Sequence, residues 1–309
     1  MERLPSGGHL VAAPFVSASA DARPRDDVTG APLVGDGVKP HLGLDVKYTP
    51  NADTAIDLTI KPDFSQVESD TAQISANERF ALFFPEKRPF FLEGVDLFQT
   101  PIQAVYTRTI TAPVWGGRVT GKQNGIRYTA LVADDAGGGS AIIPGPNGSS
   151  LAPVDEGSIV FVGRAKRDMG LSFLGVIATD REAKSGLSHN RVVGPDFQWR
   201  PSGTDVVTGQ MLYSGTRTPT RPDLASEWTG QSFASHGAHI AWSHNTTHFD
   251  AFAQYRDFGD GFRADVGSCR RSATGRRSAA AAGQSVRPGS SLGCERSSPP
   301  TGSLTDRAR

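Results

Sequence analysis

Residues 115–132, WGGRVTGKQNGIRYTALV, carry the clearest structural signal in the chain. Apolar or small residues alternate with polar ones on both sides of Asn124-Gly125, and a period of two residues is typical of a β-strand. Asn-Gly supplies the two positive φ angles that a two-residue hairpin turn requires. The stretch therefore predicts antiparallel strands at 115–122 and 126–132, joined by a tight turn.

The same alternation continues through most of the chain, and a helical period is absent apart from a short candidate turn near 66–80. Upstream, the pattern predicts strands at 42–48 and 54–61. Downstream, it predicts strands at about 158–167, 170–179, 191–200, 203–214, 230–243 and 247–257. The fold class is therefore all-β, and we expect an antiparallel meander.

The connections between these strands alternate between short and long. The short turns fall at 50–53, 124–125, 168–169, 201–203 and 245–246. The long connections fall at roughly 20–40, 63–103, 136–157, 180–190 and 215–229. Outer-membrane β-barrels sort their connections in this way, with tight turns at the periplasmic rim and longer loops outside. The pattern predicts one sheet in sequence order, curved into an incomplete outer-membrane-type barrel, with every short turn at one end.

A soluble β-sandwich is the alternative, because the alternation is imperfect. Strand 158–167 places Ile159 and Phe161 on one face but Val160 and Val162 on the other, and strand 170–179 is apolar on both faces. A sandwich mixes hairpins with crossovers and has no reason to sort its loops by length, which favours the barrel. Aromatic belts at the two lipid interfaces are expected of a barrel. The candidates are Trp115, Tyr128, Trp199 and Tyr213.

Residues 63–98 form the densest mixture of aromatic and charged residues in the chain. The phenylalanines in it are Phe64, Phe80, Phe83, Phe84, Phe90, Phe91 and Phe98. Loops of this length are uncommon in compact domains, and disordered segments are poor in aromatic residues. We therefore expect an ordered loop at 63–103 that folds inward, with most of its phenylalanines buried on the concave side of the sheet.

The charges of this loop are the candidate lumen-lining or binding residues. They are Asp63, Glu68, Asp70, Arg79, Glu86, Lys87, Arg88, Glu93 and Asp96. Alternating charges inside a barrel can form a constriction that selects solutes. The same residues can instead pair with one another and pin the loop, with Arg88 as the central cation. The two roles are compatible.

Catalytic and metal chemistry is poorly supported by the sequence. Glu68 and Glu93 are the candidates for an acid/base pair, but glycoside hydrolysis depends on a carboxylate separation that sequence does not give. His236 and His239 should point to opposite faces of one strand, and His244 and His248 flank a turn. The only G-x-S-x-G match, GSSLG at 289–293, lies in the basic tail without a predicted strand or helix beside it, so it is not a nucleophile elbow. Neither an H-E-x-x-H motif, a P-loop nor a calcium-loop spacing is present. We expect no metal and no cofactor, and the sequence leans away from an enzyme.

Charge is unevenly distributed along the chain. Residues 268–309 contain eight arginines but only Glu295 and Asp306 as acids, whereas the whole chain has 32 basic and 32 acidic residues. Residues 1–267 are therefore net acidic, which argues against nucleic-acid binding. Both cysteines, Cys269 and Cys294, lie in the tail, which has no aromatic residue. We expect residues 1–267 to form the barrel-like domain and 268–309 to be disordered. The tail is either an out-of-frame translation or a natural basic extension.

Neither a signal peptide nor an 18-residue apolar run is evident in the sequence. The stretch KPDFSQVESDTAQISANERFALFFPEKRPFFLEGVDLF (61–98), however, resembles the signature of the bacterial family called domain of unknown function 5916. HLGLDVKYTPNADTAIDLTI, WGGRVTGKQNG and GDGFRADVG are similar to that family as well, so the resemblance covers roughly residues 1–267.

The resemblance implies a barrel-like module at the cell surface or in the outer membrane of a Gram-negative bacterium. In the family, this module usually follows a carbohydrate-binding domain of the family 9 type. That domain and the export signal are missing here, so we expect a truncated piece of a longer protein. The implied partners are outer-membrane lipid and carbohydrate, and the implied function is solute passage or glycan handling. The alternatives are a secreted glycan-directed hydrolase and a non-catalytic carbohydrate-associated surface module.

Overall fold

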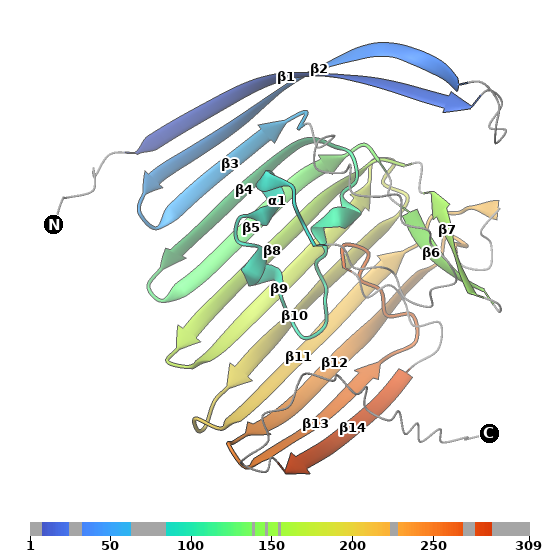
Figure 1. The fold of residues 1–309 in the computed structure, drawn as a ribbon. Coiled ribbons are helices and arrows are strands. Elements are labelled where there is room, and N and C mark those ends of the chain that lie inside the picture. The colour runs from blue at the N-terminus through green and yellow to red at the C-terminus, as the bar shows by residue number, and fades with distance from the viewer. Residues whose placement is uncertain are drawn as a thin grey trace.

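The computed structural model describes residues 8–24, 33–62, 85–137, 140–145, 148–153, 156–222, 228–267 and 276–285. Within them, one antiparallel sheet holds twelve strands in sequence order, interrupted only where a small two-stranded sheet, β6–β7, is inserted between β5 and β8 (Figure 1). The predicted all-β meander is confirmed.

The strands of the large sheet are β1 (His9–Pro24), β2 (Leu33–Asn51), β3 (Thr54–Ile60), β4 (Pro113–Gln123), β5 (Ile126–Asp135), β8 (Ser158–Met169), β9 (Ser172–Ala183), β10 (His189–Trp199), β11 (Asp205–Arg217), β12 (Ser232–Asn245), β13 (Phe249–Phe258) and β14 (Arg276–Ser285). The inserted strands are β6 (Ser140–Gly145) and β7 (Gly148–Pro153).

The five turns predicted to be short lie at one end of the sheet, as the sequence predicts, and the other connections lie at the opposite end (Figure 1). One of those, between β9 and β10, is itself short. The turn between β4 and β5 has φ 51° at Asn124 and φ 76° at Gly125, the left-handed pair that this hairpin type requires. Side chains alternate between the two faces along each strand, and the hairpin turns fix the register between neighbouring strands. Together they decide which residues lie on the concave face.

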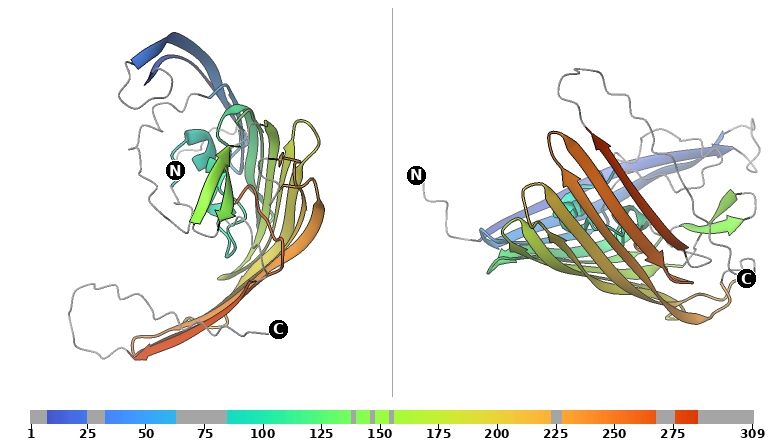
Figure 2. Two further views of the ribbon diagram at one scale, coloured as in Figure 1. Left: turned by 90° about the vertical axis from the view of Figure 1, so that its right-hand side faces the viewer. Right: turned by 90° about the horizontal axis from the view of Figure 1, so that it is seen from below.

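The sheet curls into a trough, with β1 and β14 at its two open edges (Figure 2). Residues 85–112, which we call the inner segment, run along the concave side between β3 and β4 (Figure 1). The inner segment contains three short helices, α1 (Pro89–Leu92), η2 (Val95–Phe98) and η3 (Thr107–Thr109). No helix in the described ranges is long and apolar enough to cross a membrane.

The hydrophobic core lies between the concave face and the segments that cover it. From the sheet come Leu131, Ala133, Val160, Val162, Ile177, Val192 and Leu212. From the inner segment come Phe91, Phe98, Ile102, Ala104, Val105 and Ile110, and residues 259–267 add Phe262, Ala264 and Val266. In the parts of the chain that the structure describes, no second large sheet covers this face, so the sandwich alternative is wrong.

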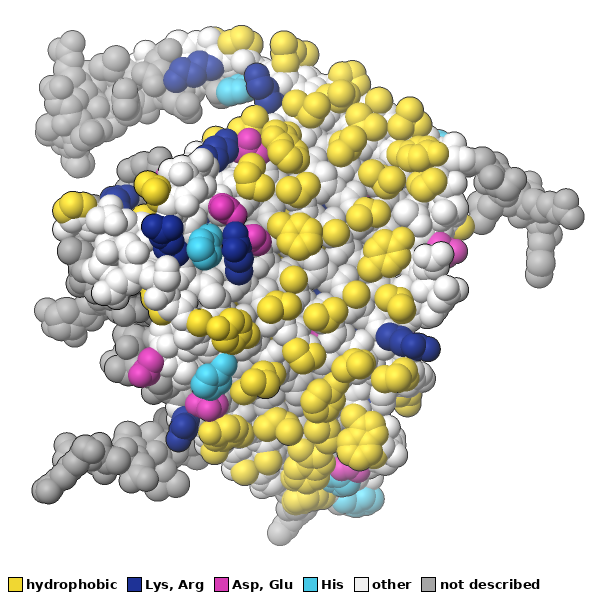
Figure 3. Space-filling model, turned by 180° about the vertical axis from the view of Figure 1, so that it is seen from behind, with side chains coloured by type: hydrophobic (Ala, Val, Ile, Leu, Met, Phe, Trp, Pro, Cys, Tyr) yellow, Lys and Arg dark blue, Asp and Glu magenta, His cyan; other side chains and the backbone are white. Residues whose placement is uncertain are grey.

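The convex face is covered with apolar side chains that remain exposed (Figure 3). They include Leu58, Ile60, Trp115, Ile159, Phe161, Leu174, Val176, Val193, Phe197, Trp199, Met211, Tyr213, Ile240, Trp242, Phe249 and Tyr255. On β8, Ile159 and Phe161 point outward, whereas Val160 and Val162 are fully buried on the concave side. The concave apolar face of this strand therefore packs in the core that includes the inner segment, whereas its convex apolar face is exposed.

Three of the four predicted belt residues, Trp115, Trp199 and Tyr213, are 40–57% exposed on the convex face. Tyr128 is half-buried because its ring lies over Gly121, its cross-strand partner, where a Cβ atom would collide with the ring. An aromatic ring that covers a glycine across a strand pair fixes the register without leaving a gap.

Three expectations about segment boundaries are wrong. The connection placed at 20–40 is instead largely strand, because β1 extends to Pro24 and β2 begins at Leu33. The connection placed at 180–190 is a five-residue turn, because β9 extends to Ala183 and β10 begins at His189. The tail is not structureless throughout, since β14 pairs with β13, although its described side chains at 277–283 are all exposed. Residues 268–275 and 286–309 lie outside the described residues.

Candidate functional site

The inner segment is shaped by two residues with restricted or unusual backbone angles. Pro89 occupies the first turn of α1, where its fixed φ and missing N–H are tolerated. Gly94, at φ 67°, reverses the chain between α1 and η2. This path points Phe91 and Phe98 into the core, where they are 0% and 3% exposed. Burial of a phenylalanine contributes roughly 1.5–3 kcal/mol, so the two rings anchor the segment.

Arg88 joins the beginning of the inner segment to its end. Its Nε and Nη2 atoms donate to the Glu86 carboxylate at 2.9 and 2.8 Å. Nη1 donates to the carbonyl oxygen of Ile110 at 2.6 Å, and Nη2 donates to that of Thr107 at 2.9 Å. The guanidinium carbon also lies 4.2 Å from the centre of the Phe91 ring. The expected pairing of Arg88 with a neighbouring carboxylate is thus observed, and its geometry pins the segment.

Glu86 is held in its charged form by this arrangement. Burial alone would raise the pKa of Glu86, but hydrogen bonds from Arg88 and Thr107 and the positive charge of Arg88 lower it below its usual value. The Thr107 hydroxyl donates to Glu86 Oε2 at 2.5 Å. The side chains of Arg88 and Glu86 are only 3% and 5% exposed, so their charges must remain paired.

Three arginines of the sheet hold the inner segment against the concave face. Arg118 on β4, Arg164 on β8 and Arg181 on β9 each donate a hydrogen bond to a backbone carbonyl oxygen of the segment. The acceptors are the carbonyl oxygens of Glu93, Leu97 and Thr109, at 2.7, 3.0 and 2.9 Å. Each arginine is also paired with an aspartate of the sheet: Asp57, Asp196 and Asp135, respectively. The same arrangement therefore occurs three times along the trough: an arginine pairs with an aspartate of the sheet and donates a hydrogen bond to the backbone of the inner segment.

A second stretch, residues 259–267, lies beside the inner segment. The backbone N–H of Tyr106 donates to the carbonyl oxygen of Val266 at 2.7 Å, which links the two. Asn190 on β10 accepts from the N–H of Asp265 at 2.9 Å and donates to the carbonyl oxygen of Arg263 at 3.2 Å. The family-like motif GDGFRADVG is therefore part of the filling of the trough.

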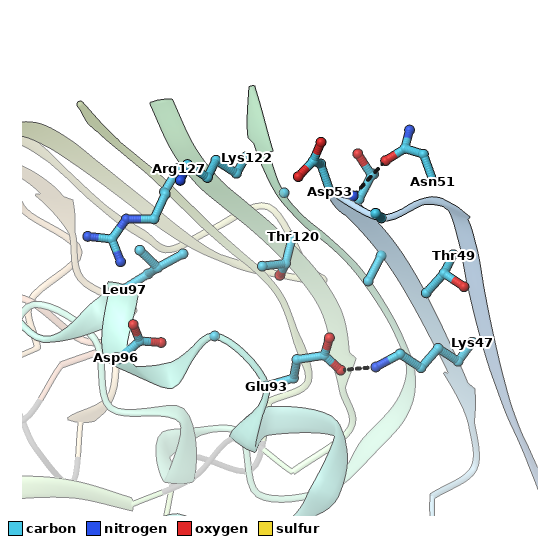
Figure 4. Close-up of a pocket in the computed structure, with 15 residues that line it drawn as sticks. Lys47, Thr49, Asn51, Asp53, Glu93, Asp96, Leu97, Thr120, Lys122 and Arg127 are labelled. Carbon is cyan, nitrogen blue, oxygen red and sulfur yellow. Dashed lines mark hydrogen bonds and ion pairs between the residues drawn. The ribbon is translucent and has the colours of Figure 1, made fainter. Parts of the chain in front are cut away.

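A pocket of about 480 Å³ remains between the inner segment and the short-turn ends of β2, β3, β4 and β5 (Figure 4). Its charged lining residues are Lys47, Asp53, Glu93, Asp96, Lys122 and Arg127, and its uncharged polar ones are Thr49, Asn51, Thr54 and Thr120. The carboxylates of Glu93 and Asp96 come from the inner segment, whereas the three cations come from the sheet. The inner segment thus contributes only acids to the pocket, whereas the sheet side contributes the three cations and one acid, Asp53.

Part of this charge is already paired. Lys47 Nζ lies 2.5 Å from the carboxylate of Glu93, and Arg127 donates to Asp168 at 2.7 and 3.0 Å. Within the described residues, the side chains of Asp96 and Lys122 form no hydrogen bond or ion pair. Asp96 comes from the inner segment and Lys122 from β4, and both side chains are exposed where they line the pocket.

The predicted loop charges therefore divide into three groups. Glu86 and Arg88 pin the inner segment, and Lys87 is an exposed neighbour in the same turn. Glu93 and Asp96 line the pocket. Asp63, Glu68, Asp70 and Arg79, with Phe64, Phe80, Phe83 and Phe84, lie outside the described residues, so the Glu68–Glu93 pair stays a prediction.

The sequence reasoning did not identify the arginines of the sheet as site residues. Arg118, Arg164 and Arg181 lie on the face of each strand opposite to its exposed apolar residues. A charged residue in the middle of a strand is the signal that marks Arg118 and Arg164, whereas Arg181 lies between Asp180 and Glu182 near the end of β9 and has no such signal. Each must have a partner, because an unpaired buried charge is costly.

The histidines do not form a metal site. His236 is exposed and His239 is buried, which confirms that they point to opposite faces of β12. His244 Nδ1 lies 2.9 Å from a carboxylate oxygen of Asp205 at the short-turn end. In the described part of the chain, no group of three histidine, cysteine or acidic side chains is placed to hold a metal ion.

Comparison with solved structures finds outer-membrane proteins among the similar folds. In-vitro folded OmpT of Vibrio cholerae has a TM-score of 0.37 and 8% sequence identity, covering 89% of this chain and 95% of OmpT. OmpT of Vibrio cholerae expressed in the outer membrane also has a TM-score of 0.37, with 10% identity and coverages of 91% and 97%. The comparison with curated proteins finds no match.

The family comparison covers three of the four family-like motifs. The matching family model spans residues 9–185, which include β1 to β9, the inner segment and all of the pocket lining, whereas GDGFRADVG lies beyond them. The chain therefore belongs to the family described as domain of unknown function (DUF5916).

Proposed function

We propose that the protein is an outer-membrane β-barrel protein. The inner segment fills most of the barrel interior, and small polar solutes pass through the space that remains beside it. The observation that carries this proposal is the contrast between the two faces of the sheet: the convex face exposes apolar side chains, whereas the concave face buries ion pairs among its apolar side chains. A soluble sheet buries its apolar face, whereas a membrane barrel turns that face to lipid and keeps its interior polar.

The lengths of most strands suit a bilayer, although the apolar band on β10 is short. On β10 the outward apolar residues run from Val193 to Trp199, six residue steps or roughly 20 Å along the strand, which is less than the roughly 25 Å height of a barrel's apolar band. The band ends towards the long connections at an exposed ion-pair cluster, in which Arg191 contacts Asp180 and Glu182 at 3.2 and 3.0 Å. Strands β4, β5 and β8 to β13 have 10 to 14 residues each. A tilted transmembrane strand needs about 9–11.

The proposal requires the two edges of the sheet to be covered. An open edge in hydrocarbon leaves backbone N–H and C=O groups without partners, at a cost of several kcal/mol for each group. With twelve strands, all antiparallel to their neighbours, β1 and β14 run in opposite directions. Their direct pairing would therefore continue the same antiparallel pattern and close a barrel with an even number of strands.

Reconstitution of the full chain into lipid vesicles tests this function. We expect a folded form that migrates differently on electrophoresis before and after heating, and vesicles that swell in isotonic solutions of small polar solutes. Arg88→Ala removes the link between the two ends of the inner segment and should accelerate swelling. Arg191→Ala, a loss of the same residue type from the exposed ion-pair cluster, should leave it unchanged. Protein that stays outside the vesicles, or vesicles as tight as empty ones with both variants, would contradict the proposal.

A further inference from the structure

The pocket between the inner segment and the short-turn ends of β2 to β5 suggests a class of solute. We infer that it binds small zwitterions, solutes such as a dipeptide that carry a positive and a negative group a few ångströms apart. The passage of these solutes rests on the proposed function, but their binding to the pocket does not.

The arrangement of charge in the pocket carries this inference. Asp96 presents a carboxylate from the inner segment, and Lys122 presents an ammonium group from β4 (Figure 4). In the described chain neither side chain forms a hydrogen bond or a close ion pair, and each has only a longer-range charge interaction, Asp96 with Arg127 and Lys122 with Asp168. Lys47, Glu93 and Arg127 are already in close ion pairs. A zwitterion can satisfy Asp96 and Lys122 together, while a simple anion or cation can satisfy only one of them and is repelled by the other.

The size and remaining chemistry of the pocket agree with a small polar ligand. A volume of about 480 Å³ is within the range of small-molecule sites. The lining includes Thr49, Asn51, Thr54 and Thr120, whose hydroxyl and amide groups can donate and accept hydrogen bonds. The pocket has no aromatic lining residue in the described chain, so stacking of a flat ring is not offered. The lining contains three cations and three acids, which leaves no net charge to concentrate a simple ion.

Calorimetric titration of the detergent-solubilised full chain with glycylglycine tests the binding step. Arabinose, acetate and methylammonium serve as the neutral, anionic and cationic probes. We expect glycylglycine to bind most tightly. Asp96→Asn and Lys122→Gln should each weaken its binding about tenfold, because each removes one charge-assisted hydrogen bond. Glu182→Gln and Arg167→Gln, the same chemical changes at exposed positions outside the pocket, should have no effect.

An exchange of the two charges sharpens the test. Asp96→Lys alone and Lys122→Glu alone should abolish glycylglycine binding, since each creates a pocket with an excess of one charge. The double variant should recover most of the binding, because a zwitterion can turn around. Equal binding of arabinose and glycylglycine, or single and double variants that behave alike, would overturn the inference.

Vesicle swelling separates this inference from the proposed function. Binding of glycylglycine without any swelling would support the pocket and refute solute passage. Swelling at equal rates in arabinose and glycylglycine, with no response to the Asp96 and Lys122 variants, would support passage and refute the zwitterion site.

Discussion

The two faces of the large sheet differ in the burial of their side chains and in the chemistry of the residues they carry. On the concave face, Arg164 and Asp196 are each only 1% exposed, and their charges are paired and bonded to the inner segment. On the convex face, Met211 and Val193 are 61% and 49% exposed, and no described layer covers them. Buried charge beside exposed hydrocarbon is the reverse of a soluble core. The contrast teaches that this sheet buries paired charges on its concave face and leaves apolar side chains exposed on its convex face.

Removal of one member of a buried ion pair on the concave face should destabilise the protein more than a single change at an exposed position. Arg164→Ala leaves Asp196 buried without its cation and also removes the hydrogen bond to the carbonyl oxygen of Leu97. We expect a loss of about 3–5 kcal/mol in the free energy of unfolding. Urea unfolding of the vesicle-bound protein measures it.

Arg127→Ala is the matched control for Arg164→Ala. The Arg127–Asp168 pair has similar bidentate geometry, but its side chains are 34% and 36% exposed. Exposed pairs contribute about 0–1 kcal/mol, so the loss should be small. Equal losses in the two variants would mean that the inner pairs are as well solvated as those at the rim.

A charge on the convex face probes the other half of the comparison. Met211, in the middle of β11, and Met169, at the turn end of β8, are both exposed. If lipid covers this face, Met211→Arg should cost about 2–4 kcal/mol of folding free energy in vesicles, and Met169→Arg about 0–1 kcal/mol. In a water-exposed sheet, the two substitutions would be equally mild.

Acid should loosen the inner segment through Glu86. Because the folded-state pKa of Glu86 is lowered, its contribution is fully present above its usual pKa near 4.5 and is lost as the pH falls through the lower folded-state value. We therefore expect wild-type stability to decline below about pH 4.5. Glu86→Gln should be less stable at neutral pH, by roughly 1.5–3 kcal/mol. A variant with the wild-type acid response would show that Glu86 is not the group that titrates.

The sequence predicted the meander well because strand pairing depends on local signals. Asn124-Gly125 favours the positive φ angles of a tight turn between two strands with alternating side chains, and the structure has that turn. The faces of β8 were ambiguous, because Val160 and Val162 are as apolar as Ile159 and Phe161. The ambiguity disappears only when the inner segment is placed, since it supplies the second apolar surface.

The site was only partly predictable. Arg88 and Glu86 are two residues apart, so their pairing follows from local spacing. The contact between Lys47 and Glu93 joins residues 46 positions apart and depends on how the inner segment crosses β2. The bond from Arg164 to the carbonyl oxygen of Leu97 spans 67 positions and has no side-chain acceptor, so no residue pattern could reveal it.

The most direct test of the account uses two neighbouring residues of β4. Thr120 lines the pocket, and Val119 lies on the opposite face of the strand. Single cysteines at these positions, in a Cys269→Ser, Cys294→Ser background, can carry a fluorescent label in vesicle-bound protein. A quencher attached to lipid chains should quench the label at 119 and leave that at 120 bright, whereas iodide in water should do the reverse. Labels that respond equally to iodide, with no response to the lipid quencher, would contradict a convex face in lipid and a polar interior.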